Sequence, residues 1–101
     1  MAVDNSLPRL GVTYCSTTSL TPNPGNARTH SPHQIRQIAD SIRAFGFGNP
    51  ILVDEAGMVL AGHGRLKAAQ LLGMAEVPTI CISGLSNTQK RAFVLADNKI
   101  A

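Results

Sequence analysis

The segment Leu60–Gly73 (LAGHGRLKAAQLLG) restricts the fold of this 101-residue chain more than any other. It reads as the end of an apolar strand, a turn containing Gly62 and Gly64, and a helix with Arg65 and Lys67 in its first turn. Glycine allows turn geometries that a Cβ would penalise and lets the backbone approach a ligand closely. The first amides of a helix lack intrahelical partners and carry the positive end of its dipole. With the guanidinium of Arg65 beside them, they form either a phosphate-binding turn or simply a tight strand-to-helix corner.

The composition is that of a single globular domain and excludes several classes of function. Hydrophobic residues make up 44% of the chain and charged residues 15%, and the length is sufficient for one core. Aromatic residues are only 4%, which argues against a stacking platform for single-stranded nucleic acid. The net charge of +3 is compatible with a polyanionic partner without requiring one. No signal peptide or membrane span is visible, so we expect a cytoplasmic protein without membrane partners.

The cysteines and histidines show no metal-ligand spacing. Cys15 and Cys81 are far apart in the sequence, and His30, His33 and His63 form no His-x-x-x-His pattern. Because Cys81 lies in the apolar run 77–82, we expect it to be a buried thiol that packs as a small hydrophobe.

The best-defined local signals surround a helix in the first half of the chain. Ser31 can cap it, Pro32 suits its first position, and Gln34 completes a capping box. Gly46 is a natural end. The apolar residues between these limits recur at helical spacing, which predicts a stripe that packs into the core: Ile35, Ile38, Ala39, Ile42 and Phe45.

The remaining segments predict a small α+β domain. We expect strands at 12–20, 49–54, 58–61 and 77–82, and helices at about 64–72 and from Ser86 onward. The order β, α, β, β, α, β, α favours a small mixed β-sheet with about three helices packed on it. Residues 1–19 would form a leader and the first strand, and residues 20–101 the domain proper. Further core residues are expected on the later helices: Leu66, Ala69, Leu72 and Phe93.

The order of short motifs resembles that of a known family. The motifs are Asn23-Pro-x-x-x-Arg28, Ser-Ile-x-x-x-Gly46, Asn-Pro-Ile, Ala-Gly-x-x-Arg-x-x-Ala-Ala, Val-Pro-x-Ile and Leu-Ala-Asp-Asn. Together they resemble the N-terminal domain of the ParB/sulfiredoxin superfamily over residues 20–101. The spelling Ala-Gly-His-Gly-Arg is similar to stand-alone or DNA-methyltransferase-linked ParB-like domains. The resemblance implies the ParB/sulfiredoxin fold and bacterial or phage proteins associated with the nucleoid.

The resemblance also implies a nucleotide site at the glycine turn. In ParB proteins of chromosome partition this domain binds a cytidine nucleotide with magnesium and acts as a switch that closes a clamp on DNA. The family spells the turn Gly-Glu-Arg-Arg; Gly62 and Arg65 match, whereas His63 replaces the acidic residue and Gly64 the first arginine. Arg28 matches an upstream arginine near the nucleotide. Because one charge-assisted phosphate contact is missing, the affinity and the preference for CTP over ATP are open.

Asp97 and Asn98 match a late Glu-Asn pair of the family. The resemblance implies that they hold Mg²⁺, with Asn98 also near the phosphates, although they could merely end the last helix. His63 could act as a general base or contact the ligand, or be an ordinary turn histidine, and Asp97 is the second candidate for a catalytic group. Arg65 could instead pair with a local carboxylate.

Two functions remain open at this point. The first is a nucleotide-binding regulatory domain, taking CTP or ATP with Mg²⁺, of a DNA-associated protein such as a partition or DNA-modification protein. The alternative is an enzyme of the same fold: a phosphoryl-transfer enzyme, a slow nucleoside triphosphatase or a non-specific nuclease. Sulfiredoxin activity is disfavoured, because His63 stands where sulfiredoxins carry the catalytic cysteine.

The partners follow from the same resemblance. We expect DNA to be contacted through a downstream domain, since the chain ends soon after Asn98, or only weakly and without sequence preference. Relatives often dimerise through this domain when they are liganded.

Overall fold

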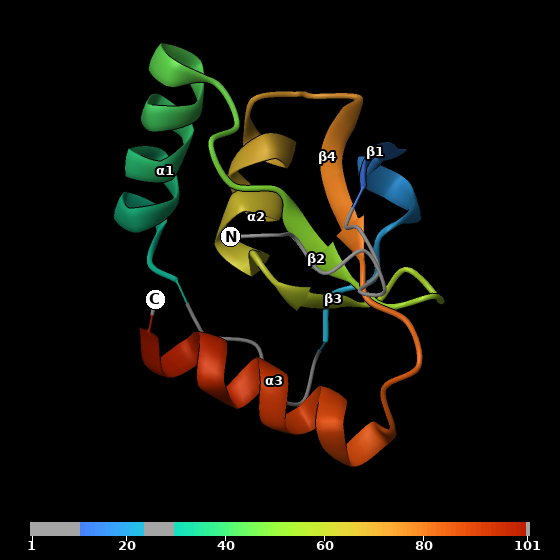
Figure 1. Ribbon diagram of the computed structural model, residues 1–101. Coiled ribbons are helices and arrows are strands. Elements are labelled where there is room, and N and C mark those ends of the chain that lie inside the picture. Colours follow the sequence, from blue (N-terminus) through green and yellow to red (C-terminus); the bar gives the residue numbers. More distant parts are fainter. Residues whose placement is uncertain (1–10, 24–29, 101) are drawn as a thin grey trace, which may run out of the picture.

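The chain forms a four-stranded mixed sheet with three helices (Figure 1). The computed structural model describes residues 11–23 and 30–100, with the backbone alone for 97–100. The strands are β1 (Val12–Ser16), β2 (Ile51–Val53), β3 (Val59–Ala61) and β4 (Glu76–Cys81); a 3₁₀ turn, η1, covers Thr17–Ser19. The helices are α1 (Pro32–Phe45), α2 (His63–Leu71) and α3 (Asn87–Ile100). The predicted α+β class with a small mixed sheet is confirmed.

The sheet has the order β1-β4-β2-β3. β4 runs parallel to β2 and antiparallel to β1, and β2 and β3 form an antiparallel hairpin. Figure 1 shows α2 beside β2, α1 packed on α2, and α3 crossing beside β3. The buried cluster between the sheet and α2 has members from β2, β3, β4 and α2 and from the residue after η1: Leu20, Ile51, Val53, Val59, Leu66, Ala69 and Val77.

The local signals located α1 correctly. Ser31 Oγ accepts from the Gln34 amide at 3.1 Å and Gln34 Oε1 accepts from the Ser31 amide at 2.9 Å, which completes the predicted capping box. Gly46 ends the helix at φ +78°, and the amide of Gly46 donates to Ile42 O. The same box opens α3, where Ser86 and Gln89 exchange bonds of 3.1 and 2.8 Å.

Several other expectations need correction. The first strand ends at Ser16, because Ser16 Oγ accepts from the Thr18 amide and turns the chain into η1. α2 begins at His63, one residue earlier than predicted. Cys81, expected to be buried, is exposed at the last position of β4.

The predicted stripe on α1 is only partly buried. Ile35, Ile38 and Ile42 are half-buried and Phe45 is 88% exposed, because α1 packs on α2 rather than on the sheet. Leu72 and Phe93 are also half-buried, whereas Leu66 and Ala69 are core as predicted. The apolar face of α1 therefore remains available to line a cavity.

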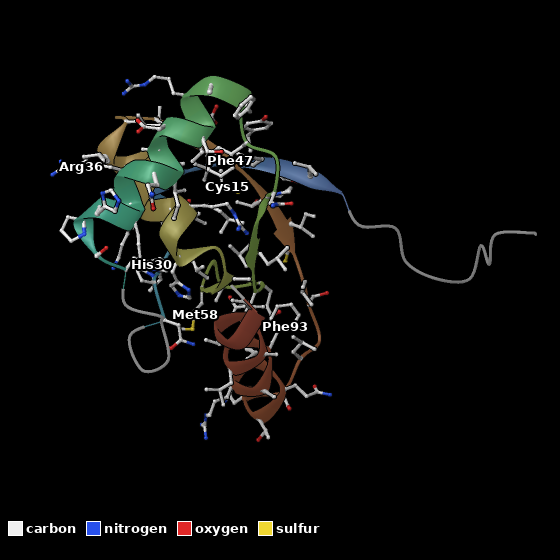
Figure 2. All side chains as sticks on the ribbon, turned by 90° about the vertical axis from the view of Figure 1, so that its left-hand side faces the viewer. Cys15, His30, Arg36, Phe47, Met58 and Phe93 are labelled. Atoms are coloured by element: carbon white, nitrogen blue, oxygen red, sulfur yellow. The ribbon has the colours of Figure 1, made fainter. Side chains whose placement is uncertain are left out.

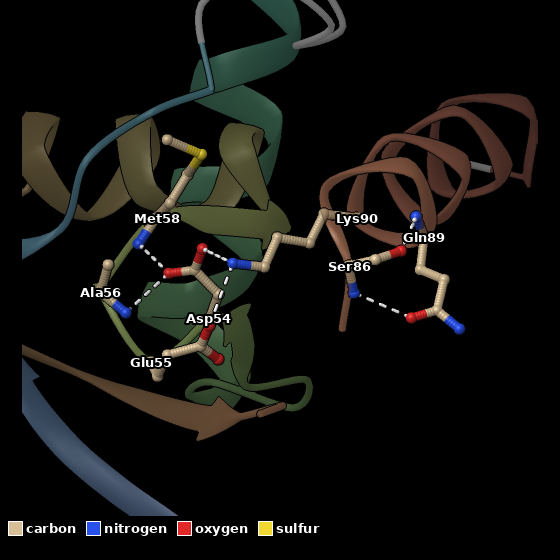
Figure 3. A network of polar contacts seen from close by, with 7 residues as sticks. All are labelled: Asp54, Glu55, Ala56, Met58, Ser86, Gln89 and Lys90. Carbon is tan, nitrogen blue, oxygen red and sulfur yellow. Dashed lines mark hydrogen bonds and ion pairs between the residues drawn. The ribbon is translucent and has the colours of Figure 1, made fainter. Parts of the chain in front are cut away.

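A buried carboxylate anchors α3 to the β2–β3 hairpin (Figure 3). Asp54 Oδ1 accepts from the amides of Ala56 and Met58, at 2.9 and 2.8 Å. Its Oδ2 lies 2.9 Å from Lys90 Nζ, which also lies 3.1 Å from Glu55 Oε1. Burial raises the pKa of Asp54, but the hydrogen bonds from Lys90, Met58 and Ala56 outweigh it and leave the pKa below its usual value. Lys90 is thus a structural contact between α3 and the hairpin.

No helix within the described residues is long and apolar enough to cross a lipid bilayer.

Candidate nucleotide site at the start of helix α2

A cavity of about 570 Å³ lies where α1, the loop that follows it and the start of α2 meet. α1 contributes both apolar and polar side chains, among them Ile38, Gln37 and Ser41. The four residues of the glycine turn predicted to bind phosphate, 62–65, all line it. The structure therefore brings the turn to the wall of a cavity large enough for a small-molecule ligand.

The backbone of the turn has the geometry that its glycines allow. Gly62 has φ +99° and precedes α2 in a left-handed conformation, which side chains other than glycine adopt rarely. The hydrogen-bond ladder of α2 starts with the Leu66 amide donating to Gly62 O at 2.9 Å. As the N-cap residue, Gly62 offers no side-chain hydrogen bond to the first turn of α2, in contrast to Ser31 at α1 and Ser86 at α3. The first residues of α2 line the cavity.

Arg65 folds back over the turn. Its Nη2 donates to Pro50 O at 3.2 Å, and it would lie only 3.0 Å from a Cβ added at Gly62. Glycine at position 62 thus makes room for the guanidinium. This bond joins Arg65 to a backbone carbonyl, and the alternative of a carboxylate partner for Arg65 stays a prediction.

His63 is buried, with 4% of its surface exposed, and is tied to the chain that precedes α1. Its Nε2 accepts from the amide of Asn23 at 3.2 Å, which requires a lone pair on that nitrogen. The bond holds the segment around Asn23 against the glycine turn. It also occupies the atom that a general base would use.

His30 reaches the turn from the segment before α1 (Figure 2). A Cβ added at Gly64 would meet its Nε2 at 2.9 Å and Ile38 Cδ1 at 3.0 Å. The imidazole can lie this close only because residue 64 has no side chain.

The titratable side chains that line the described part of the cavity are all basic. Its titratable lining residues are His30, His63 and Arg65, and no Asp or Glu lines it in the part of the chain that is described. Such a site favours an anionic ligand.

The remaining predicted site residues stay predictions. Arg28 lies outside the described residues. Asp97 and Asn98 lie in the last turn of α3, but their side chains are likewise outside the description. No cluster of three potential metal-ligating side chains occurs within the described ranges.

The sequence did not single out the polar lining residues Gln37 and Ser41. A signal was present, because both flank the apolar stripe of α1 at helical spacing, next to Ile38 and Ile42. Polar residues at the edge of a stripe are ordinarily solvated, so only the fold shows that they face a cavity.

Comparison with known proteins identifies relatives over almost the whole chain. The ParB N-terminal domain family model matches residues 1–99. The ParB-like nuclease domain-containing protein YnaK of Escherichia coli is 47% identical over 83 residues, 82% of this chain and 95% of that protein. The probable chromosome 2-partitioning protein ParB of Deinococcus radiodurans is 42% identical over 74 residues, 70% of this chain but only 25% of that protein.

Solved structures agree. The C-terminally truncated chromosome-partitioning protein ParB of Caulobacter crescentus, complexed with CTP-γ-S, has a TM-score of 0.78 and 28% identity, covering 90% of this chain and 54% of that one. Sulfiredoxin from Arabidopsis thaliana has a TM-score of 0.65 at 21% identity over 73% of this chain and 86% of that one, which shows a shared fold alone. The predicted resemblance is confirmed, and the chain belongs to the ParB N-terminal domain family.

Proposed function

We propose that this domain binds a nucleoside triphosphate, CTP or ATP, together with Mg²⁺ in the cavity beside α2, and that the bound nucleotide regulates a DNA-associated protein. The phosphates would lie against Gly62, Gly64 and Arg65. The nucleotide complex of the Caulobacter crescentus ParB, at 28% identity, supports the class of ligand.

One observation carries the proposal: the start of α2, which has no side-chain cap from Gly62, lines a cavity whose titratable groups, among the described residues, are all basic. Amides at a helix N-terminus and an arginine fork are donors that suit phosphate oxygens. Neutral polar groups of the same lining, Gln37 and Ser41, suit the sugar or the base. The apolar stretch of α1 beside them supplies the contact surface that a nucleoside requires.

Mg²⁺ would be held in this site mainly by the phosphates of the bound nucleotide. Mg²⁺ in nucleotide sites is usually held by phosphates, waters and one or two protein oxygens, so a ready cluster of carboxylates is not needed. Asp97 and Asn98, in the last turn of α3, would supply hard oxygen donors for it. The ion would neutralise phosphate charge and orient the triphosphate.

The test is isothermal titration calorimetry of CTP, ATP and GTP, each with Mg²⁺, against the wild type, Arg65→Ala and Lys67→Ala. Losing a charge-assisted hydrogen bond costs about 1.5–3 kcal/mol, so Arg65→Ala should weaken binding by at least about tenfold. Lys67 is the matched control, because it is exposed on the same helix and does not line the cavity. Its loss should lower the affinity only slightly, through long-range charge.

Two results would overturn the proposal. One is the absence of binding for all three nucleotides. The other is an equal loss for Arg65→Ala and Lys67→Ala, which would indicate general attraction to a basic surface rather than a defined site.

The enzymatic alternative is less well supported by the geometry. The Nε2 atom of His63, a candidate base, already accepts a hydrogen bond from Asn23. We therefore favour a regulatory role over a catalytic one. Assays of nucleotide hydrolysis and DNA cleavage distinguish the two. Phosphate release or DNA cleavage that stops in Asp97→Asn while binding persists would establish the enzyme instead.

DNA association would be a property of the larger protein or assembly. A ParB of Caulobacter crescentus is known in complex with the centromeric parS site. This chain spans only a quarter of the Deinococcus radiodurans ParB, though nearly all of YnaK. We propose that this domain alone contacts DNA weakly and with strong salt dependence, in the bacterial cytoplasm, and dimerises when liganded.

A further inference from the structure

The most exposed large apolar side chain that the structure describes lies on the rim of the cavity. Phe45, the last residue of α1, is 88% exposed, more than any other large apolar residue in the described part of the chain. Leaving an aromatic ring in water is unfavourable, because its burial is among the larger apolar gains open to a side chain. The ring lines the same cavity as the glycine turn. A ligand that fills the cavity would therefore cover it.

A continuous apolar wall on α1 joins this ring to the glycine turn. Ile38, Ile42 and Phe45 recur at i, i+4 and i+7, which places them on one face of the helix, and all three line the cavity. The wall begins at the turn, because a Cβ added at Gly64 would meet Ile38 Cδ1 at 3.0 Å. From Ile38 to Phe45 the helix rises by about 10 Å, at about 1.5 Å per residue. A nucleoside triphosphate with its phosphates at the turn is long enough to reach the far end.

The far end of this wall is also where the aromatic lining of the cavity lies. Phe45 and Phe47 both line the cavity, and they are two of the three phenylalanines of a chain that has one tyrosine and no tryptophan. Phe47 is half-buried and packs against the buried cluster, so the fold holds it in place. A Cβ added at Gly46 or Gly48 would meet no described atom beyond the neighbouring residues within 4 Å, so the space around this loop is open. A flat group can therefore approach the Phe45 ring from the cavity.

We infer that Phe45 binds the base of the nucleotide by stacking, at the end of the cavity away from the phosphates. This inference rests on the proposed nucleotide site and adds the residue that holds the base. The ring is apolar and uncharged, so it suits the face of a nucleobase and offers no donor to a phosphate. One ring is sufficient for one base, whereas a single strand of nucleic acid needs several. Because every base has a π-face, the contact should strengthen the binding of CTP and of ATP alike.

The experiment compares wild type, Phe45→Ala and Phe45→Leu by calorimetry with Mg-CTP, Mg-ATP and, as a ligand without a base, inorganic tripolyphosphate with Mg²⁺. We expect Phe45→Ala to bind both nucleotides about tenfold more weakly than wild type, and tripolyphosphate equally well. Phe45→Leu keeps an apolar side chain without a π-face and should still lose most of this affinity. Leu71→Ala is the matched control: Leu71 is 60% exposed on α2 and does not line the cavity, so its variant should follow the wild type. Because both side chains are exposed, the urea midpoint should hardly change in any variant.

Nuclear Overhauser effects give a second readout, which a merely structural role would not produce. The ring protons of Phe45 in the wild type should show them to the base protons of bound CTP and ATP.

Three results would overturn the inference. One is equal nucleotide affinity of Phe45→Ala and wild type, and another is a loss of tripolyphosphate affinity as large as the loss for the nucleotides. The third is a dimer that Phe45→Ala dissociates while the nucleotide affinity stays unchanged, which would assign the ring to an interface between copies. If Arg65→Ala still weakens nucleotide binding, any of these leaves the nucleotide site intact and removes Phe45 alone. No nucleotide binding by the wild type overturns both proposals.

Discussion

The three helices of this domain begin in two different ways. α1 and α3 each start with a serine whose hydroxyl and backbone exchange hydrogen bonds with a glutamine three residues later. α2 begins at His63, and its N-cap residue Gly62 has a left-handed conformation and provides no side-chain cap. Every helix must satisfy its first amides with side chains, water or a ligand. Two helices here do so within their own sequence, whereas the third leaves its first turn facing a cavity.

The surroundings of α2 and α3 differ in the same sense. In the first turn of α3, Lys90 is neutralised by the carboxylates of Asp54 and Glu55. Beside the first turn of α2, the basic groups line a cavity with no carboxylate in its described part. A charge-paired helix start stabilises the fold, whereas a basic start suits an anionic ligand. On the proposed function, the start of α3 has a structural role and the start of α2 a binding role.

Breaking the contact of Asp54 with Lys90, which joins the β2–β3 hairpin to α3, should have the largest effect on stability. Asp54→Ala removes the acceptor of the Ala56 and Met58 amides and leaves Lys90 without its buried partner. Unmade buried hydrogen bonds cost about 1–3 kcal/mol each, so we expect the free energy of unfolding to fall by about 3 kcal/mol in urea titrations. Glu55→Gln is the control, because the Glu55 side chain is 51% exposed and should change the midpoint hardly at all.

The lowered pKa of Asp54 also predicts that the free energy of unfolding falls at acid pH. Because the pKa of folded Asp54 is below its unfolded value, its stabilisation is present above about pH 4 and is lost as the pH falls through the folded pKa. Unfolding of Asp54→Asn should therefore depend less on pH between 4 and 2 than unfolding of the wild type. Parallel curves for the two proteins would show that Asp54 contributes no such linkage.

The next test adds a side chain at position 62, the N-cap of α2. Gly62→Ala places a Cβ on a backbone of φ +99° and 3.0 Å from Arg65 Nη2. We expect a loss of about 1–2 kcal/mol from the left-handed conformation and a displaced guanidinium that binds nucleotide more weakly. Gly73→Ala is a matched control, because Gly73 also has positive φ (+70°) but its Cβ would meet open space. It should lose similar stability and keep the affinity; an equal loss of affinity would mean that strain, not the position of Arg65, explains the effect.

The smallest effects should come from the capped helices. Ser31→Ala or Ser86→Ala should each cost about 1 kcal/mol of stability, measured by denaturant unfolding. Nucleotide affinity should remain unchanged if these caps are structural. A tenfold loss of affinity in Ser86→Ala would contradict the separation of roles between α2 and α3.

The sequence predicted the locally determined parts of the fold. The limits of α1 follow from Ser31, Pro32, Gln34 and Gly46, whose effects act within one turn of the helix. Residues 62–65 could also be singled out as a group that lines one cavity, because the glycine pattern and the arginine lie in one short segment.

The contacts that give the site its character join distant segments. Asn23 meets His63 across 40 positions, and Lys90 meets Asp54 across 36. The close approach of the His30 ring to the backbone of Gly64 likewise depends on how the chain around α1 packs on α2. No local periodicity encodes such pairs, and the periodicity of α1 by itself wrongly placed Phe45 in the core.

The most direct test of the account is a ¹⁵N NMR titration of the domain with Mg-CTP and Mg-ATP, with the corresponding nucleosides as phosphate-free controls. The account predicts that the amides of Gly62, Gly64 and Arg65 shift on adding the triphosphates and much less with the nucleosides, while the capped first turns of α1 and α3 stay in place. Shifts at the start of α3 that exceed those at the start of α2, or none at the glycine turn, would contradict it.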